Sequence, residues 1–527
     1  MSLSFGPSLA ISLALVLGAT WATSRRRPSR LLPLLLIGAV LTVHVALYWR
    51  FTVDDSFITY RYARNWAGGL GPVYQPGERV EGCTSLGWAG LLALATRWGL
   101  DIDGAAKGIG LLCTLLTLPA ALGLARRVTS QSHAAWIAPF ALAVSPLFAA
   151  WACAGMEAPL VAALLVWAVR EHVVDAERER RVPLGALLFG LLVWMRPEGV
   201  LFATAGLFSL LTGSEPWRLR AHRAFRFGVI AAIVAVPFWI GRWSYYGHFF
   251  PNTFYAKIDA HGVPFTRGLH SLMDLATCLG AGFLALVLLP VLRARWKESV
   301  WRTLWLVIGS YLGYVVYVGG DVLHLRFYVH VFPLIAVCAA AGAGILATVL
   351  EGLRPALAHR LGALVVGMLA AGWTAFAYQR DAVALAARDQ FGAGYVVQNA
   401  SNIRQANIPL GQWLERNAGP DALMATWDIG AIGYYSRLPI VDLYGLTDST
   451  LARLNHQGAS KRECALYLER RSPTLIVAYG AGAFAQLGWV HPEWLKANYT
   501  VHSVWKNGSG GALVLFERND ILLPTGP

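Results

Sequence analysis

The chain has 527 residues, of which 56% are hydrophobic and only 14% are charged. Soluble domains carry roughly a quarter charged residues, so this composition indicates a polytopic membrane protein. The formal net charge of +14 does not indicate a nucleic-acid partner, because the basic residues are dispersed into short loops between apolar segments.

Apolar segments recur along the first part of the chain, and several are shorter than the roughly 20 residues of a full membrane crossing. They are residues 5–23, 31–49, 105–125, 134–150, 157–170, 183–195, 200–212, 228–241, 268–292, 301–317, 327–350 and 361–378. We therefore expect a polytopic α-helical fold with about 10–12 transmembrane helices. Residues 85–98 are expected to form an interfacial helix.

The loops between these segments differ in charge. One alternating set is rich in arginine, for example Arg126–Arg127 and Arg218–Arg226, and the positive-inside rule places this set in the cytoplasm. The opposite set holds nearly all of the unusual polar residues. We therefore expect a single site at the extracytoplasmic face of the membrane.

The longest polar stretch in the first two-thirds of the chain is residues 50–84. Asp54 and Asp55 lie where an apolar segment ends, and SFITYRYARNW predicts a short amphipathic helix with Asp55 or Ser56 as its N-cap. The helical repeat places Arg61 and Arg64 on one face. An alternative is a solvated loop held by ion pairs. Turns and a charged run follow, with Glu78, Arg79 and Glu81.

Other polar residues stand at abrupt junctions of apolar segments. Glu157 and Glu198 fit either a functional role or the N-terminus of a helix. Arg196 lies between two short apolar segments and is costly to immerse unpaired, so we expect it to be paired. His324 is either a structural histidine or, since it stands between Asp321 and Arg326, part of the site.

Residues 379–527 have more charge, more turns and no apolar run of spanning length. The segments ALMATWD, LPIVDLYG, PTLIVAY and GALVLFER predict strands, and NIPLGQWLERNA and KRECALYLERR predict helices. We expect a soluble extracytoplasmic α/β domain here, following a membrane domain of residues 1–378 that includes loop 50–84.

An extracytoplasmic transferase has no nucleotide pool, so its donor must be delivered in the membrane, as a polyprenyl-phosphate sugar is. Cations would bind the phosphate, and the candidates are Arg61, Arg64, Lys257 and Arg326. A carboxylate would act as general base on the acceptor hydroxyl, and Asp54 is our candidate.

The ordered blocks DDSFITYRYARNWAGGLGPVYQPGERVEG, MEAPL, RPEG, YYG…PNTFYAK and GGD..H.R resemble the GT-C membrane glycosyltransferases, and among them the terminal arabinofuranosyltransferases of mycobacterial cell-wall arabinan. The resemblance implies a decaprenyl-phosphate arabinofuranose donor, a catalytic centre on the outer face of the plasma membrane, and a β-linked product from a β-linked donor. This chain departs from the family pattern at Cys83, where the family has an aromatic residue. The resemblance also implies that Asp54 and Asp55 lie at the catalytic centre, surrounded by Glu157, Arg196, Asp321, His324 and Arg326.

The sequence thus predicts a glycosyltransferase embedded in the lipid bilayer. Its donor is a lipid-linked sugar and its acceptor is a hydroxyl of a cell-envelope glycan. The alternatives are a transporter or flippase of lipid-linked sugars, a GT-C transferase with another pentose or hexose donor, and a non-catalytic scaffold. No cofactor is required, although a divalent cation is possible at paired carboxylates, and the cysteines have no metal-ligand spacing. The predicted site comprises catalytic Asp54 and Asp55, donor-binding Arg61, Arg64, Lys257, His324 and Arg326, and supporting Glu78, Arg79, Glu81, Glu157, Arg196, Glu198, Asn252 and Asp321.

Overall fold

Contacts divide the chain of this computed structural model into two compact units. The helical unit comprises Met1–Arg50, Ala106–Trp239 and Pro264–Val396, and the mixed unit comprises Phe51–Ala105, Ile240–Val263 and Val397–Pro527. The structure describes residues 5–24, 31–178, 180–257, 265–293, 298–320, 323, 325–353, 399–480, 492–508, 510–524 and 526. The predicted segment 361–378 lies outside the described residues.

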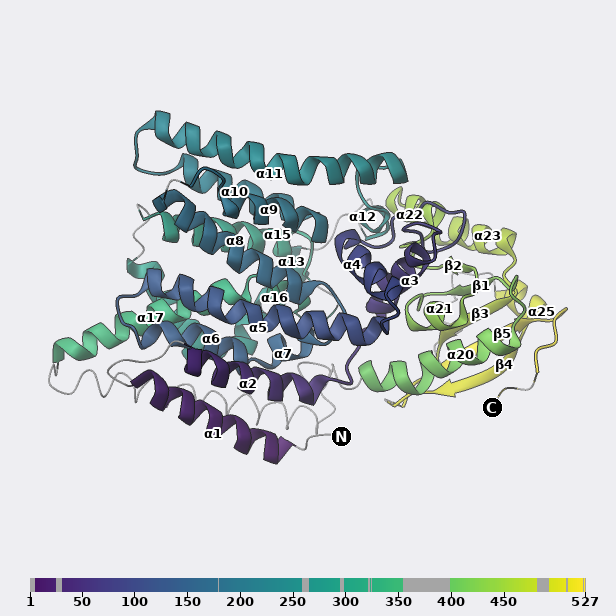
Figure 1. Ribbon diagram of the computed structural model, residues 1–527. Helices are drawn as coiled ribbons and strands as arrows, with labels where there is room; N and C mark the ends of the chain where they lie inside the picture. Colours follow the sequence, from purple (N-terminus) through teal and green to yellow (C-terminus); the bar gives the residue numbers. More distant parts are fainter. Residues whose placement is uncertain are drawn as a thin grey trace. The chain divides into compact units, whose positions relative to one another are not determined.

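The helical unit is built from apolar helices, most of which run side by side in one general direction (Figure 1). α1 packs on α2, α8 on α9, α10 on α15 and α14 on α17. The helices are α1 (Phe5–Ser24), α2 (Leu31–Tyr48), α5 (Ile102–Val128), η1 (Ala134–Trp136), α6 (Ile137–Ala143), α7 (Pro146–Ala152), α8 (Ala158–Arg178), α9 (Leu184–Met195), α10 (Gly199–Leu211), α11 (Trp217–Tyr246), α13 (Phe265–Leu279), α14 (Ala281–Leu288), η2 (Leu289–Arg293), α15 (Ser299–Tyr317), α16 (Arg326–Val329) and α17 (Phe332–Leu353). The first four residues of α5 and the last seven of α11 belong to the mixed unit.

Among the described residues, four helices are long and apolar enough to cross a membrane, or up to six if two bent pairs each count as one span. The four are Leu31–Tyr48, Ile102–Val128, Trp217–Tyr246 and Phe332–Val349. The predicted segments 183–195 and 200–212 form the short apolar helices α9 and α10. The expected fold class, several apolar helices with a C-terminal α/β domain, is confirmed.

Two predicted single spans are broken helices. Segment 134–150 bends by 53° between α6 and α7, because Ser145 accepts a hydrogen bond from the Phe148 amide and Pro146 begins α7. Segment 268–292 bends by 105° at Gly280, whose φ of 76° lies in the left-handed region that favours glycine. Both segments were therefore predicted wrongly as continuous helices.

Two other helices are longer than predicted. α11 begins at Trp217 rather than at residue 228, so the arginines expected in a loop lie in its first turns. α8 continues to Arg178, beyond the predicted end at residue 170. In both cases charged residues continue the helix past the apolar run, which the hydropathy pattern alone does not mark.

The mixed unit contains a five-stranded sheet with the strand order β2-β1-β3-β5-β4. β1 is parallel to β2 and β3, whereas β5 is antiparallel to β3 and β4. The four predicted strands are present, and β4 was missed because its residues YTVHSVWK mix polar and apolar types. The elements are α3 (Asp54–Ala67), α4 (Leu86–Arg97), α12 (Asn252–Lys257), η3 (Ile403–Asn407), α20 (Ile408–Asn417), β1 (Met424–Thr426), α21 (Ala431–Ser436), β2 (Ile440–Asp442), α22 (Ser449–His456), α23 (Lys461–Arg471), β3 (Leu475–Tyr479), α25 (Pro492–Asn498), β4 (Tyr499–Lys506) and β5 (Ala512–Arg518).

Alternate residues of the strands belong to two hydrophobic clusters, because successive side chains of a strand point to opposite faces. One cluster joins Leu475 and Val477 of β3 to helices α20 and α21 and to Ile58 and Tyr62 of α3. The other joins Ile476 of β3 to α22, α23 and α25. Helix α3 thus packs in the core of the C-terminal sheet, and residues 51–105 group with this sheet rather than with the predicted membrane domain.

Candidate functional site

The carboxylate of Asp54 holds the start of α21. Its Oδ2 accepts a hydrogen bond from the Gly430 amide at 3.1 Å, and its Oδ1 accepts one from the Ala431 amide at 2.9 Å. The predicted N-cap is wrong: α3 begins at Asp54 itself, with Val53 as N-cap and no side-chain cap bond. The aspartate that begins α3 instead bonds amides of the C-terminal sheet domain.

Two further carboxylates stand near Asp54. The pKa of Asp54 is raised to about 8, first by burial and then by the negative charges of Asp428 and Asp55, against the lowering effect of the two amide donors. Asp428 follows β1, and the Asn407 side chain donates to its Oδ2 at 3.1 Å. Burial raises the pKa of Asp428 as well. Neutral pH therefore leaves a proton on this pair of carboxylates.

Sequence reasoning missed Asp428, although ALMATWD carried a usable signal. Side chains at the carboxyl ends of parallel strands commonly line ligand sites in α/β sheets. Asp428 ends the segment predicted as a strand. Applying this rule to the end of the predicted strand would have identified Asp428 as a candidate.

The structure gives Arg61 and Arg64 backbone partners. Arg61 is 2% exposed, and its guanidinium donates to the carbonyls of Tyr74 at 2.9 Å, Gly433 at 2.7 Å and Leu438 at 2.8 Å. Arg64 donates to the Tyr434 carbonyl at 2.7 Å and lies over the Tyr434 ring. The predicted common face of the two arginines is confirmed, because both reach α21. Their role in binding a phosphate stays a prediction, which these contacts do not favour.

The remaining predicted residues of the mixed unit have different surroundings. Glu81 is buried and paired with Arg242, although burial raises its pKa to about 7. Asn252 is buried, and its side chain donates to the Gly445 and Leu446 carbonyls. Glu78 accepts a bond from Gln75 and Arg79 lies over the Tyr245 ring, while Lys257 is exposed at the end of α12.

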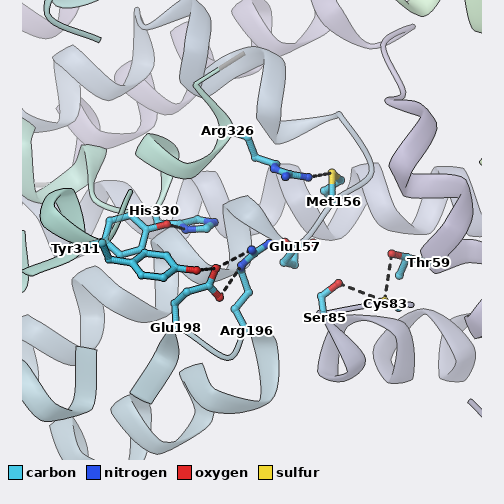
Figure 2. A network of polar contacts seen from close by, with 11 residues as sticks. Thr59, Cys83, Ser85, Met156, Glu157, Arg196, Glu198, Tyr311, Arg326 and His330 are labelled. Carbon is cyan, nitrogen blue, oxygen red and sulfur yellow. Dashed lines mark hydrogen bonds and ion pairs between the residues drawn. The ribbon is translucent and has the colours of Figure 1, made fainter. Parts of the chain in front are cut away.

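A second group of predicted residues meets in the helical unit (Figure 2). Arg196 donates to Glu157 at 2.6 Å and to both oxygens of Glu198, the shorter contact being 2.8 Å. Arg196 is extended because it precedes Pro197, which ends α9 at Met195 and turns the guanidinium toward the two carboxylates. The expected pairing of Arg196 is present. Glu198 stands at the N-cap of α10 without a side-chain cap bond, so capping does not account for it.

Arg326 lies in the same group. Its guanidinium and that of Arg196 both lie over the Phe327 ring, 5.0 and 5.1 Å from the ring centroid, and Arg326 also contacts the Met156 sulfur. Among the described residues, the Oε2 of Glu157 is buried without a hydrogen-bond partner, and so is the Nε2 of His330. A buried carboxylate oxygen without a donor costs free energy. These two atoms are candidates to contact a ligand.

Sequence reasoning also missed His330, Tyr311 and Tyr314. Tyr311 bonds His330 at 2.6 Å (Figure 2). Tyr314 donates to Glu198 at 3.0 Å. The two tyrosines lie inside the apolar helix α15, where aromatic residues are ordinary, so no pattern set them apart. The predicted Asp321 and His324 lie outside the described residues.

Cys83, where the resemblance expects an aromatic residue, is buried in the mixed unit. It contacts the hydroxyls of Thr59 and Ser85 at 3.5 and 3.6 Å (Figure 2). Neither Cys83 nor Cys464 takes part in a disulfide. In the described part of the chain, no three His, Cys, Asp or Glu side chains come close enough together to hold a metal ion.

The fold is that of the GT-C membrane glycosyltransferases. The crystal structure of ArnT from Cupriavidus metallidurans bound to undecaprenyl phosphate matches 91% of this chain and 97% of its own, with a TM-score of 0.58 and 14% sequence identity. The archaeal oligosaccharyltransferase AglB from Archaeoglobus fulgidus, in complex with an inhibitory peptide and a dolichol-phosphate, matches 94% of this chain and 74% of its own, with a TM-score of 0.55 and 12% identity.

In sequence the chain is similar to two proteins named terminal β-(1→2)-arabinofuranosyltransferase. The one from Mycobacterium tuberculosis is 31% identical over 252 residues, which are 44% of this chain and 39% of that protein. The one from Corynebacterium glutamicum is 28% identical over 348 residues, which are 57% of this chain and 49% of that protein. The chain thus spans less than half the length of these relatives. Residues 399–520 match a domain of unknown function (DUF8728).

Proposed function

We propose that this protein is a glycosyltransferase that moves a sugar, with arabinofuranose as the first candidate, from a polyprenyl-phosphate donor to a hydroxyl of a cell-envelope glycan. The similarity to the two arabinofuranosyltransferases supports the class and the sugar. The observation that carries the proposal is the Asp54 carboxylate. It is held at 2.9 and 3.1 Å by two amides, and its pKa of about 8 suits a general base.

In the proposed reaction, the bond between the anomeric carbon and the donor phosphate breaks, and its electron pair leaves with the polyprenyl phosphate. A bond forms between the anomeric carbon and the acceptor oxygen. The acceptor proton passes to Asp54, which must be ionised to take it.

The group around Arg196 is proposed to bind the donor. Arg326 is proposed to bind the donor phosphate, since its guanidinium carries a fixed positive charge and is 4% exposed. The unpartnered Oε2 of Glu157 is proposed to accept a hydrogen bond from a sugar hydroxyl. A divalent cation remains a proposal for the paired carboxylates and is not required by this scheme.

Transfer by the purified protein in lipid nanodiscs tests the proposal, with a panel of polyprenyl-phosphate pentoses and hexoses and an arabinan acceptor. We expect transfer from the arabinofuranose donor, and a loss of about 10²–10⁴-fold in turnover for Asp54→Asn, because asparagine keeps the shape but cannot accept a proton. Asp448→Asn is the control, since asparagine caps α22 about as well as aspartate.

The comparison with Asp55→Asn assigns the base. If Asp55→Asn loses turnover while Asp54→Asn keeps it, the enzyme stands and the two roles are exchanged. Normal transfer by the folded double variant excludes both aspartates from the chemistry. Transport of the donor lipid without transfer by the wild-type protein would favour a flippase instead.

A further inference from the structure

The loop between β1 and α21 reaches Asp54 from the C-terminal sheet. It carries Asp428, and two and three residues later it supplies the amides of Gly430 and Ala431 that bond the two oxygens of Asp54. One loop therefore brings two hydrogen-bond donors and one negative charge to the same carboxyl group.

Gly430 leaves no space between the loop and Asp54. A Cβ at this position would lie 2.1 Å from Oδ2 of Asp54 and 2.2 Å from its backbone oxygen, which is far closer than such atoms approach. The backbone of the loop thus packs directly on Asp54. Any side chain at residue 430 would displace either the loop or the aspartate.

Asp428 is fixed where it stands. Its amide donates to the Thr426 hydroxyl at 3.1 Å, the Asn407 side chain donates to its Oδ2 at 3.1 Å, and the Tyr479 hydroxyl bonds its carboxylate. These donors favour the charged form of Asp428. The partners come from the helical turn η3 and from the ends of strands β1 and β3.

We propose that Asp428 is a positioning residue for Asp54: the β1–α21 loop holds the Asp54 carboxylate between two amides, and the charge of Asp428 strengthens Asp54 as a proton acceptor. This inference rests on the proposed function, in which Asp54 takes the acceptor proton. It gives the C-terminal domain a direct part in the chemistry, since it sets where Asp54 stands and how tightly it holds a proton.

Other titratable groups also act on Asp54. Among the described residues they include Asp55 on the same helix, Tyr74 after α3 and Tyr479 at the end of β3. Both tyrosines have a raised pKa because they are buried, so they are neutral across the range in which Asp54 titrates. Asp428 and Asp55 are therefore the charges that move the proton affinity of Asp54.

The test measures the proton on Asp54 directly. Infrared titration of the purified protein follows the protonated-carboxyl band that disappears in Asp54→Asn. In Asp428→Asn the midpoint of this band should move down by about one pH unit, because a neighbouring negative charge is removed. In Gly430→Ala it should move up, because the amide donors that lower the pKa are displaced. Gly419→Ala, which meets no atom within 4 Å, is the control.

Transfer assays complete the test. The acid limb of the pH–rate profile should shift with the infrared midpoint in Asp428→Asn, and the turnover above that limb should fall several-fold because the base is weaker. An unchanged midpoint in folded Asp428→Asn overturns the inference. If that variant does not fold, Asp428→Ser tests the same charge. Absence of transfer by the wild-type protein refutes the proposed function, while the infrared titration still decides whether Asp428 acts on Asp54.

Discussion

Two arginines predicted to bind the same phosphate have different surroundings. The guanidinium of Arg61 donates to three backbone carbonyls, so its hydrogen-bonding capacity is directed into the fold. Arg326 contacts the Met156 sulfur and lies over the Phe327 ring. Because the Arg61 guanidinium is held by backbone carbonyls, Arg326 is the better candidate of the two for an anionic ligand.

This difference predicts opposite phenotypes. Arg61→Ala removes the guanidinium donors to the Gly433 and Leu438 carbonyls, whereas the Tyr74 carbonyl still accepts from Asn65. Each buried group left without a donor costs about 1–3 kcal/mol, so the thermal midpoint should fall strongly. Arg326→Ala should keep the midpoint within a few degrees and raise the donor KM more than tenfold, since a desolvated charge contact is commonly worth about 2–5 kcal/mol. Thermal scans and donor saturation curves separate the two effects.

The exposed Arg462 provides the matched control, since Arg462→Ala should change neither quantity. A well-folded Arg61→Ala variant with a raised donor KM would return Arg61 to the site. Unchanged donor saturation in folded Arg326→Ala would remove Arg326 from it.

At the scale of elements, the sequence predicted those helices and strands whose own residue pattern determines them. The apolar runs that form α1, α2 and α5 and the four expected strands were recognisable because their residues carry the periodicity themselves. The breaks at Ser145–Pro146 and Gly280 lie inside apolar runs, so hydropathy did not mark them. Contacts between residues far apart in the sequence could not be predicted. Every segment has backbone carbonyls, so the sequence does not show which of them Arg61 binds. Likewise, the residues ALMATWD do not indicate that Asp428 lies near Asp54.

The junction between α9 and α10 depends on the positive charge of Arg196. Arg196 is buried with Glu157 and Glu198, and Arg196→Met would leave two carboxylates close together without a cation. Breaking a buried pair in this way costs about 3–5 kcal/mol, so the thermal midpoint should fall steeply. The triple variant Arg196→Met, Glu157→Gln, Glu198→Gln should recover most of this loss. A triple variant as unstable as the single one would show that the charges are not the cause.

At the scale of the whole molecule, the chain enters the mixed unit three times, at residues 51–105, 240–263 and 397–527. The sequence suggested a boundary near residue 378 because composition changes there. Composition does not report that α3 packs under the C-terminal sheet, since Ile58 and Tyr62 are as apolar as residues of a membrane segment. The first polar stretch and the last part of the chain therefore form one folded body.

If this body is extracytoplasmic, as we propose from loop charge, both of its parts must be reachable from outside the cell. Cysteines introduced in residues 66–76 and 455–460 should react with a membrane-impermeant maleimide on intact cells, whereas cysteines in 218–226 should react only after the cells are opened. The unaltered chain, whose described cysteines form no disulfide, gives the background. Reaction of 218–226 alone on intact cells would reverse the orientation and remove the case for a lipid-linked donor.

The contacts of Arg61 also constrain how the protein is made. Its acceptor Gly433 lies 372 residues further along the chain. At a synthesis rate of about 5–20 residues per second, α3 emerges roughly 20–75 s before the Gly433 carbonyl that accepts from Arg61. Throughout that interval Arg61 and the apolar side chains of α3 lack the surroundings that bury them in the folded protein, and a chain cut short before residue 433 never supplies them.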